Sequence, residues 1–279
     1  MIKILSIGFH SSIQDAGRYG FRHLGIPVSG CMDLNSFNLA NALLNNSSDC
    51  SVIESTFIGP TIEFLSSTYI AITGAQCHLL LNSVPVSINS VLKIEKGDIL
   101  EFGKTTLGCR NYLSIIDGFD CEDILNSQSQ YNGVTRHTLL QKNQIIVCNQ
   151  TNRSIKNRAI VKINHSFFNT KLLTVLKGPE FNLLKNEIKN RLFSKSFTLS
   201  SQSNRMAFLF NQDLSIGIKE IITSSVQPGT VQLTPSGKII ILMRDAQTTG
   251  GYSRILQLTE QSISQLAQLS FNQNIKFCL

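Results

Sequence analysis

Short apolar or alternating runs, each closed by Gly, Pro, Asn or Ser, recur along almost the whole of this chain. Such runs are typical of β-strands, because alternate side chains of a strand point to opposite faces of a sheet. Runs of this kind lie at residues 1–9, 69–73, 91–94, 99–102, 145–148, 172–176 and 238–243. The sequence therefore predicts a mainly β protein.

Helical signals are confined to three places. Asp33 is a suitable N-cap for a helix over residues 34–44, and Pro179 suits the first turn of a helix that runs to residue 193. A third, short piece is expected at residues 262–268. We therefore expect only a few short helices beside the strands.

A length of 279 residues, with 42% hydrophobic and 15% charged residues, indicates a globular protein of one large or two modest domains. The chain turns polar and basic between about residues 150 and 169, before a new apolar run begins. We therefore predict two domains, 1–165 and 166–279. No apolar run approaches the length of a membrane helix, so we expect no membrane contact.

The formal net charge of +7 does not indicate nucleic-acid binding, because the basic residues are dispersed and are not interleaved with aromatic ones. The densest basic group, at residues 185–195, shares its stretch with Leu184, Ile188 and Leu192 at helical spacing. We expect the solvated side of an amphipathic helix there. Seven scattered cysteines without a C-x-x-C pair predict a cytoplasmic protein that has neither disulfides nor a zinc site.

Several familiar mechanisms lack their motifs here. The chain has no G-x-x-x-x-G-K-[ST] loop, no G-x-G-x-x-G fingerprint, no H-E-x-x-H and no G-x-S-x-G. Its five histidines show no ligand spacing. Any nucleotide would therefore bind through an unfamiliar loop or on a partner.

The apolar run at residues 238–243 leads into the segment Asp245-Ala-Gln-Thr-Thr-Gly-Gly-Tyr252, which gathers a carboxylate, an amide, hydroxyls and two glycines. Glycines let backbone N–H groups turn toward a small anion, and the threonine hydroxyls add donors. The same pattern is typical of a hairpin turn. Local sequence leaves both interpretations open.

A second polar cluster occupies residues 13–33 and contains Asp15, Arg18, His23 and Asp33. Arg18 is suited to a carboxylate or a phosphate, and Asp15 or Asp33 to a metal or a proton. The structural alternatives are an Asp15–Arg18 ion pair that braces a turn and a capping role for Asp33. Both kinds of role can coexist.

Five further polar residues, in three segments, are candidates for a functional site. Glu54 lies between apolar residues and is expected to be buried, which makes it a candidate acid or base. Asn38 and Asn41 are three residues apart and would share one helical face. Arg205 stands beside the amide of Asn204.

Taken in order, these segments resemble the KipA-like family, which includes the C subunit of bacterial 5-oxoprolinase and the carboxyltransferase half-domains of urea amidolyase. No single segment is specific, but their order runs across nearly the whole chain. The matching segments are residues 14–18, 25–30, 32–33, 39–41, Glu54 with 59–60, 73–75, 203–206, 229–232 and 245–252.

The resemblance implies tandem β-barrel domains of the cyclophilin-like type, without implying prolyl isomerase activity. It also implies one part of a larger enzyme, which would open 5-oxo-L-proline to L-glutamate with a KipI-like B subunit, together with a separate A subunit. ATP and Mg²⁺ would be the cofactors, bound at or with the partner, and metal ligands stay unassigned. Two alternatives remain: a regulatory protein that binds a KipI-like inhibitor of a histidine kinase, and a carboxyltransferase half that uses carboxybiotin.

Phosphorylation of the lactam oxygen followed by attack of water would need cations for the phosphate and carboxylates for metal and proton transfer. On this hypothesis the catalytic residues are Asp15, Asp33, Glu54 and Asp245. Substrate or phosphate would be bound by Gln14, Arg18, His23, Asn41, Asn204, Arg205, Gln247, Thr248, Thr249, Gly250, Gly251 and Tyr252. We expect the loop 245–252 to form one wall of a polar site shared with the N-terminal half.

The chain also departs from the family pattern. Many relatives have Leu-Gly-Ser-Arg-Ser-Thr where this chain has Leu-Asn-Ser-Gln-Ser-Gln at residues 125–130, and a second arginine is lost after residue 206. Glycines of the family are replaced in Asp117-Gly118 and Thr135-Arg136. Loss of cations that touch phosphate would weaken catalysis, so altered or weakened activity is predicted.

Overall fold

The computed structural model describes residues 1–149, 153, 155, 160–162, 164–215 and 218–279. The chain divides into two compact units. The N-terminal unit comprises Met1–Arg18 and Ser29–Asn164, and the C-terminal unit comprises Tyr19–Val28 and His165–Leu279. The short segment Tyr19–Val28 thus belongs to the C-terminal unit, which no sequence pattern indicated. The predicted independent domains, 1–165 and 166–279, stay a prediction.

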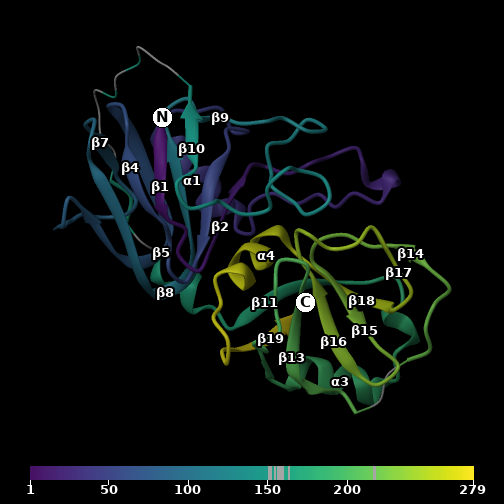
Figure 1. The fold of residues 1–279 in the computed structure, drawn as a ribbon. Coiled ribbons are helices and arrows are strands. Elements are labelled where there is room, and N and C mark those ends of the chain that lie inside the picture. Colours follow the sequence, from purple (N-terminus) through teal and green to yellow (C-terminus); the bar gives the residue numbers. More distant parts are fainter. Residues whose placement is uncertain (150–152, 154, 156–159, 163, 216–217) are drawn as a thin grey trace. The chain divides into compact units, whose positions relative to one another are not determined.

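The N-terminal unit is built on one ten-stranded sheet (Figure 1). Seven strands follow the order β2-β3-β8-β4-β1-β10-β9, and β5 joins β8 to β6 and β7. The strands are β1 Ile2–Ser6, β2 His10–Gln14, β3 Val52–Thr56, β4 Thr61–Phe64, β5 Thr68–Leu81, β6 Val84–Pro85, β7 Val91–Ile94, β8 Ile99–Ile115, β9 Phe119–Asp120 and β10 Ile145–Cys148. The long pair β5 and β8 is antiparallel, with register shifts between Gly74 and Leu79.

The alternating apolar residues of these strands form the core of the N-terminal unit. Ile4, Ile62, Ile72 and Leu100 are fully buried within it. The helix α1 Leu34–Leu43 packs Phe37 against a separate cluster that includes Tyr112. Burial of alternate side chains therefore explains why short apolar runs became strands here.

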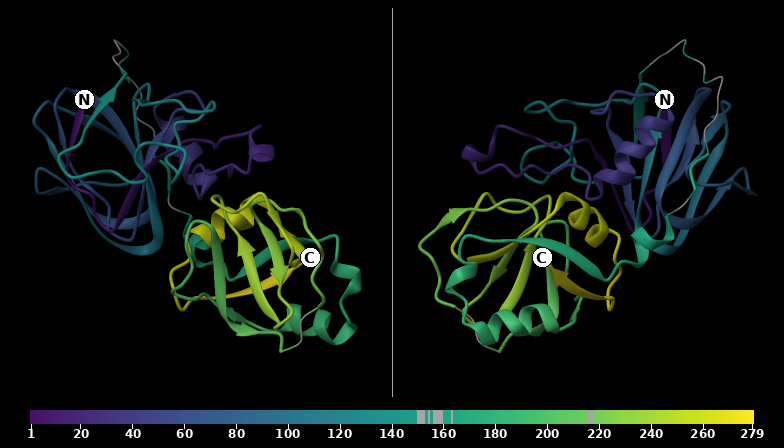
Figure 2. Two further views of the ribbon diagram at one scale, coloured as in Figure 1. Left: turned by 45° about the vertical axis from the view of Figure 1, so that its right-hand side comes forward. Right: turned by 180° about the vertical axis from the view of Figure 1, so that it is seen from behind.

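The C-terminal unit holds a seven-stranded sheet of order β12-β19-β11-β18-β15-β16-β13, and a separate two-stranded ribbon of β14 and β17. Its strands are β11 Leu172–Lys177, β12 Phe197–Thr198, β13 Ala207–Asp213, β14 Ser224–Ser225, β15 Thr230–Leu233, β16 Lys238–Leu242, β17 Thr249–Gly250, β18 Ser253–Leu258 and β19 Asn274–Cys278. Its helical pieces are η1 Arg22–Leu24, α2 His165–Asn169, η2 Phe181–Leu183, α3 Asn186–Ser194 and α4 Glu260–Ala267. Two further views show that each large sheet curls round on itself into a nearly closed barrel (Figure 2).

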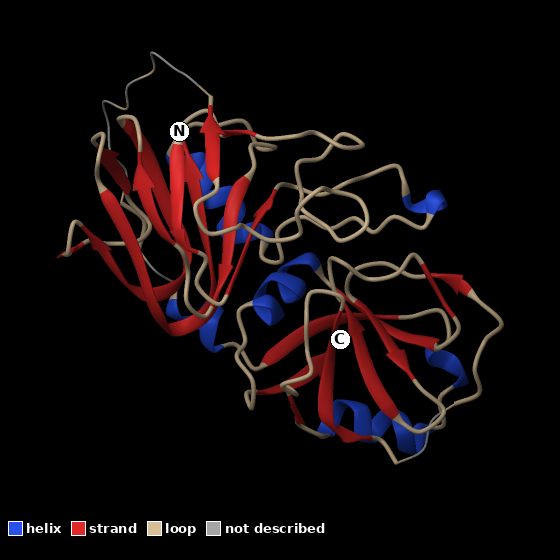
Figure 3. Cartoon of the chain, viewed as in Figure 1, coloured by secondary structure: helices blue, strands red, loops and turns tan. Residues whose placement is uncertain are grey.

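The predicted fold class is confirmed: the protein is mainly β, with few helices (Figure 3). The strands predicted at residues 91–94 and 145–148 have those bounds, and α1 begins after Asp33 as expected. The single helix predicted over residues 179–193 is wrong. Leu184 leaves the helical conformation with ψ of 134° and buries its side chain, so the chain forms η2 and then starts α3 anew. The short helix α2 was not predicted.

The basic stretch at residues 185–195 lies as predicted on an amphipathic helix. Ile188 and Leu192 are buried on one side of α3, while Arg191 and the N-cap residue Lys185 are exposed and Lys189 is half-buried. Within the part of the chain that the structure describes, no helix is both long enough and apolar enough to cross a membrane.

Candidate functional site

The predicted site residues fall into two polar clusters, one in each unit. We call the set Gln14, Asp15, Arg18, Asp33, Asn41 and Glu54 the N-terminal cluster, and the set Asn204, Arg205 and 245–252 the C-terminal cluster. The predicted single site shared by the two halves stays a prediction. The contacts within each cluster define what each side chain can do.

Asp15 is the centre of a buried set of hydrogen bonds. Its carboxylate accepts bonds from the Ser127 and Ser129 hydroxyls at 2.9 and 2.5 Å, and from the backbone N–H groups of Gly17 and Gln128 at 2.8 and 2.7 Å. Asp15 as a whole residue is only 6% exposed. Three of these four donors belong to the segment 125–130, for which the sequence predicts a departure from the family pattern. That segment therefore contributes directly to the placement of a predicted catalytic carboxylate.

The Arg18 side chain holds the same segment by donating hydrogen bonds to the backbone carbonyls of residues 124–129. Its Nε donates to the carbonyl of Ile124 at 2.9 Å, and its Nη2 donates to the carbonyls of Ser129 and Ser127 at 2.9 and 3.4 Å. The residue has 0% exposure. Gln14 assists, because its side-chain amide donates to the carbonyl of Gln130 at 3.1 Å. Arg18 thus has a scaffold role in addition to the phosphate role that the sequence predicts for it.

Asp33 caps α1, which is one of the two roles that the sequence predicts for this residue. One carboxylate oxygen accepts from the backbone N–H groups of Asn35 and Ser36 at 3.0 and 3.1 Å, and the other accepts from the Ser36 hydroxyl at 2.6 Å. Its own N–H donates to the Tyr112 hydroxyl at 2.9 Å. A cap of this kind satisfies helix N–H groups that have no partner within the helix.

Glu54 is buried, as predicted, on strand β3. Its carboxylate accepts from the backbone N–H of Met32 at 2.7 Å and lies 4.0 Å from the guanidinium Nε of Arg110. Burial first, and then the nearby Glu54 and Asp33 carboxylates, hold the pKa of Tyr112 well above its usual value. The phenol therefore stays protonated, and its oxygen accepts the hydrogen bond from the Asp33 N–H.

The amide of Asn41 ties α1 to its surroundings. It donates to the carbonyl of Cys50 at 2.8 Å, and its oxygen accepts from the Ser114 hydroxyl at 2.7 Å. Asn41 is buried whereas Asn38 is exposed. The two amides therefore do not form one polar face as the spacing suggested.

In the C-terminal cluster, Arg205 and Asp245 form a two-point ion pair. The guanidinium Nε and Nη2 donate to the two carboxylate oxygens at 2.8 and 3.1 Å, and the Asp245 N–H donates to the Arg205 carbonyl at 3.0 Å. The exposed fractions of the two side chains are 11% and 13%. The neighbouring Asn204 accepts from the N–H groups of Met206 and Ala207, which closes the turn before β13. Two residues predicted from separate motifs are therefore brought together.

The loop 245–252 is a longer connection than a hairpin turn. Thr249 and Gly250 form β17, which pairs with β14. The Thr248 carbonyl accepts from the Val226 N–H at 3.1 Å and from Arg22 Nη2 at 3.3 Å. A Cβ at Gly250 would lie 2.8 Å from the side-chain nitrogen of Gln232, so a larger residue there would require this amide to shift.

The remaining predicted loop residues have different surroundings. The Gly251 carbonyl accepts from the Ile221 N–H at 2.9 Å, and the Tyr252 carbonyl accepts from Gln232 at 3.5 Å. Gln247 is partly buried. His23, predicted with the N-terminal cluster, lies exposed on η1 in the C-terminal unit.

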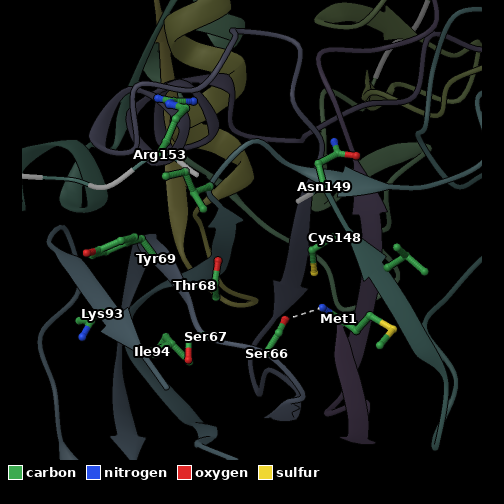
Figure 4. Close-up of a pocket in the computed structure, with 12 residues that line it drawn as sticks. Met1, Ser66, Ser67, Thr68, Tyr69, Lys93, Ile94, Cys148, Asn149 and Arg153 are labelled. Atoms are coloured by element: carbon green, nitrogen blue, oxygen red, sulfur yellow. Dashed lines mark hydrogen bonds between the residues drawn. The ribbon is translucent and has the colours of Figure 1, made fainter. Parts of the chain in front are cut away.

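Both units contain cavities. One cavity, of about 590 Å³, lies in the N-terminal unit and is lined by Met1, Tyr69, Lys93 and Arg153 among others (Figure 4). None of the described residues that line it was predicted to be functional. Among the described residues, no group of three or more Asp, Glu, His or Cys side chains is gathered to hold a metal ion.

The second cavity, of about 340 Å³, lies in the C-terminal unit and is lined by Arg22, Lys177 and Arg254 among others. Sequence reasoning missed all three residues, because they lie on three separate segments of the chain. One available signal was Arg22, which follows Arg18 in the polar stretch 13–33. The other was the pair Gly178-Pro179, directly after Lys177.

Comparisons with known proteins cover almost the whole chain. Residues 24–279 match the family model described as carboxyltransferase domain, subdomain A and B. The chain is 29% identical to the C subunit of 5-oxoprolinase from Escherichia coli over 284 residues, and 31% identical to that from Haemophilus influenzae over 286 residues. Each alignment covers 99% of this chain and 90% of the relative. A urea amidolyase of Saccharomyces cerevisiae is 40% identical over 131 residues, which are 47% of this chain and 7% of that protein.

Solved structures with the same fold extend the comparison. The crystal structure of TTHA0988 superimposes with a TM-score of 0.90 and 23% identity, and covers 100% of this chain and 55% of that one. The chain thus spans about half the length of TTHA0988, and this likeness concerns the fold alone. The urea amidolyase of K. lactis superimposes with a TM-score of 0.86 and 26% identity, over 99% of this chain and 18% of that one.

Proposed function

Because the chain belongs to the family of carboxyltransferase domains with subdomains A and B, we propose that it is a subunit of an ATP-dependent 5-oxoprolinase. The observation that carries the proposal is the alignment with the C subunits of two 5-oxoprolinases, over 99% of this chain and 90% of each relative. The reaction would open the lactam of 5-oxo-L-proline to L-glutamate. The partners, in the cytoplasm, would be a KipI-like B subunit, which binds this chain, together with a separate A subunit.

The chemistry needs both cations and carboxylates, because an unactivated lactam carbonyl is a poor electrophile until its oxygen is phosphorylated. In the C-terminal cluster, the pair of Arg205 and Asp245 supports this proposal. Both side chains are largely buried yet not fully enclosed, so part of each is accessible to a ligand group. In the N-terminal cluster, the contacts of Asp15 and Arg18 support a role in holding the site rather than in touching the substrate.

We assign the nucleotide and its Mg²⁺ to the partner protein or to a site completed by it. The chain has no phosphate-binding loop of a known type. Mg²⁺ at nucleotide sites commonly takes one or two carboxylates together with phosphate oxygens. A single carboxylate, Asp245, is available for such a role in the C-terminal cluster.

The test is reconstitution. The full chain is mixed with its B and A partners and ATP, and glutamate and phosphate are measured with 5-oxo-L-proline as substrate. We expect glutamate only when all components are present. The absence of ATP-dependent glutamate formation from the complete, folded set would overturn the proposal.

Asp245→Asn tests the role of the ion pair in this reaction. We expect a loss of turnover of about 10²-fold or more if the carboxylate acts in proton transfer, with partner binding unchanged by gel filtration. Glu187→Gln is the matched control, because Glu187 is a surface carboxylate whose side chain is 60% exposed and which also pairs with an arginine. Equal turnover in both variants would remove Asp245 from the chemistry.

A second candidate function is a carboxyltransferase half. The observation in its favour is that the urea amidolyase segment reaches 40% identity over 131 residues, which is higher than the identity to the 5-oxoprolinase relatives. It predicts carboxyl transfer from a biotinylated carrier in place of ATP-dependent glutamate formation. The regulatory alternative predicts tight binding of a KipI-like protein without any turnover, so the same reconstitution separates all three.

A further inference from the structure

We infer that the cavity of the C-terminal unit between Arg22, Lys177 and Arg254 binds a small organic carboxylate. Its elements meet from distant parts of the sequence: Arg22 lies on η1, Lys177 ends β11 and Arg254 lies on β18. All belong to one unit. None of these residues was among the predicted site residues.

The walls of the cavity are held in place by close backbone contacts. Gly178 follows Lys177, and a Cβ at that position would lie 2.3 Å from the Arg254 carbonyl, so only glycine allows the two segments to approach so closely. The Gly178 N–H donates to the Ile255 carbonyl at 2.9 Å. Arg22 is positioned by its bond to the Thr248 carbonyl at 3.3 Å. The cationic groups are therefore attached to ordered backbone.

The charge of the lining is unbalanced. Arg254 is neutralised by Glu180, whose two carboxylate oxygens accept from its Nε and Nη2 at 3.0 and 2.7 Å. Among the described residues, Arg22 and Lys177 form no ion pair, and no Asp or Glu lines the cavity with them. Lys177 instead lies 5.4 Å from the centre of the Phe181 ring. Two positively charged residues thus line the cavity without a counter-ion among the described residues, and an anion would balance their charge.

The rest of the lining decides which anion. Leu176, Pro179, Val226 and Leu256 supply apolar surface beside the cations. Inorganic phosphate has no apolar part to bury against them, whereas a carboxylate attached to a small ring or chain has both parts. A volume of about 340 Å³ is enough for such a molecule. The lining therefore favours an organic carboxylate over free phosphate.

This subsite would hold the carboxylate of 5-oxo-L-proline or of its product, and that identification rests on the proposed function. The binding of a small organic carboxylate does not depend on the proposed function. It is inferred from the cavity and is measured on the isolated full-length chain without ATP or partners. The subsite and the proposed function can therefore be disproved independently.

The experiment is calorimetric titration of the full chain with cyclopentanecarboxylate, the neutral cyclopentanecarboxamide and inorganic phosphate, with 5-oxo-L-proline as the fourth probe. We expect the carboxylate to bind and the amide to bind at least about tenfold more weakly, since a charge-assisted hydrogen bond to an anion contributes that much. Phosphate is expected to bind more weakly than the carboxylate. Equal binding of the carboxylate and the amide, tighter binding of phosphate, or no binding of the carboxylate would each overturn the inference.

Variants locate the site. Lys177→Met and Arg22→Gln should each weaken cyclopentanecarboxylate binding by about fivefold to tenfold. Lys189→Met is the matched control, because Lys189 lies over the same Phe181 ring at 5.3 Å but does not line the cavity. Thermal unfolding checks that all three variants are folded. If Lys189→Met weakens binding as much as Lys177→Met does, the site is not this cavity.

If the chain binds cyclopentanecarboxylate but not 5-oxo-L-proline, the carboxylate subsite stands and its link to ring opening is lost. If both bind and the reconstituted set forms no glutamate, the proposed function fails while the subsite remains.

Discussion

Asp15 and Asp33 in the N-terminal unit are held in a different way from three carboxylates of the C-terminal unit. In the N-terminal unit, Asp15 and Asp33 accept hydrogen bonds from hydroxyls and backbone N–H groups and are buried. In the C-terminal unit, Asp245, Glu180 and Glu260 each pair with an arginine, in the last case Arg244. A carboxylate held by backbone N–H groups is part of the scaffold, because its removal leaves those groups without partners. A carboxylate held by a side chain leaves no backbone group without a partner when that contact is replaced by a ligand.

The difference suggests that the two clusters have different roles, one in stability and the other in ligand binding. The N-terminal cluster fixes the segment 124–130 and the start of α1 around buried charges. The C-terminal cluster holds the largely buried ion pair of Arg205 and Asp245, in the same unit as the cavity lined by Arg22 and Lys177. Stability measurements and activity measurements should therefore respond differently to changes in the two clusters.

The largest effect is expected from Asp15→Ala. The change leaves the buried Ser127 and Ser129 hydroxyls and the partly buried N–H groups of Gly17 and Gln128 without their acceptor, so the free energy of unfolding should fall by about 3 to 5 kcal/mol. Urea unfolding followed by circular dichroism measures it. Ser127→Ala, which removes only one of the four donors, should cost about 1 kcal/mol. An unchanged stability of Asp15→Ala would show that the carboxylate is not a scaffold group.

Asp33→Ala should lower the free energy of unfolding by about 2 kcal/mol, because α1 loses its side-chain cap and the Asn35 and Ser36 N–H groups lose their acceptor. Asp33→Ser should restore most of the loss, since a serine hydroxyl can accept the same bonds. Urea unfolding compares the two. If serine does not restore stability, the charge of Asp33 matters beyond capping.

For the C-terminal cluster, a double-mutant cycle of Arg205→Ala and Asp245→Ala should give a coupling energy of about 1 to 2 kcal/mol. The value should change little between low and high salt, because the side chains are only 11% and 13% exposed and are weakly screened. A coupling near zero would show that the pair contributes nothing to folding. Both groups would then be held only for ligand binding.

The smallest effect concerns pH. Hydrogen bonding to Arg254 lowers the pKa of Glu180 in the folded protein. The pair therefore stabilises the fold at pH above the unfolded value of about 4.3, and this stabilisation is lost as pH falls through the lowered folded pKa. Relative to Glu180→Gln, the wild-type protein should be more stable by about 1 kcal/mol or less at pH 7, and the gap should close in strongly acidic buffer.

Urea unfolding of both proteins at several pH values gives this difference. A gap that stays constant with pH would mean that Glu180 acts through its shape and not through its charge. It would also weaken the contrast drawn between the two units.

Much of the fold could be predicted because its causes are local. Alternating apolar residues determine the strands at 91–94 and 145–148, and Asp33 determines where α1 begins. The apolar neighbours of Glu54 were enough to predict its burial. Each of these depends on residues within a few positions of each other, which sequence patterns record directly.

The contacts of Arg18 and Asp15 could not be predicted from such local patterns. Arg18 donates to carbonyls more than a hundred positions away, and every residue has a carbonyl, so no side-chain type marks these acceptors. The donors of Asp15 lie in the segment 125–130, which looked like a departure from the family and nothing more.

The amino-acid order was sufficient for the strands, the cap and the series of motifs that identify the family, since these follow from local preference and side-chain chemistry. It was not sufficient for the pairing of Arg205 with Asp245, nor for the meeting of Arg22, Lys177 and Arg254. Those depend on which strands become neighbours in the closed sheet and on where the segment Tyr19–Val28 packs. The physical reason is that packing of the whole unit, and not any local preference, brings distant charges to one place.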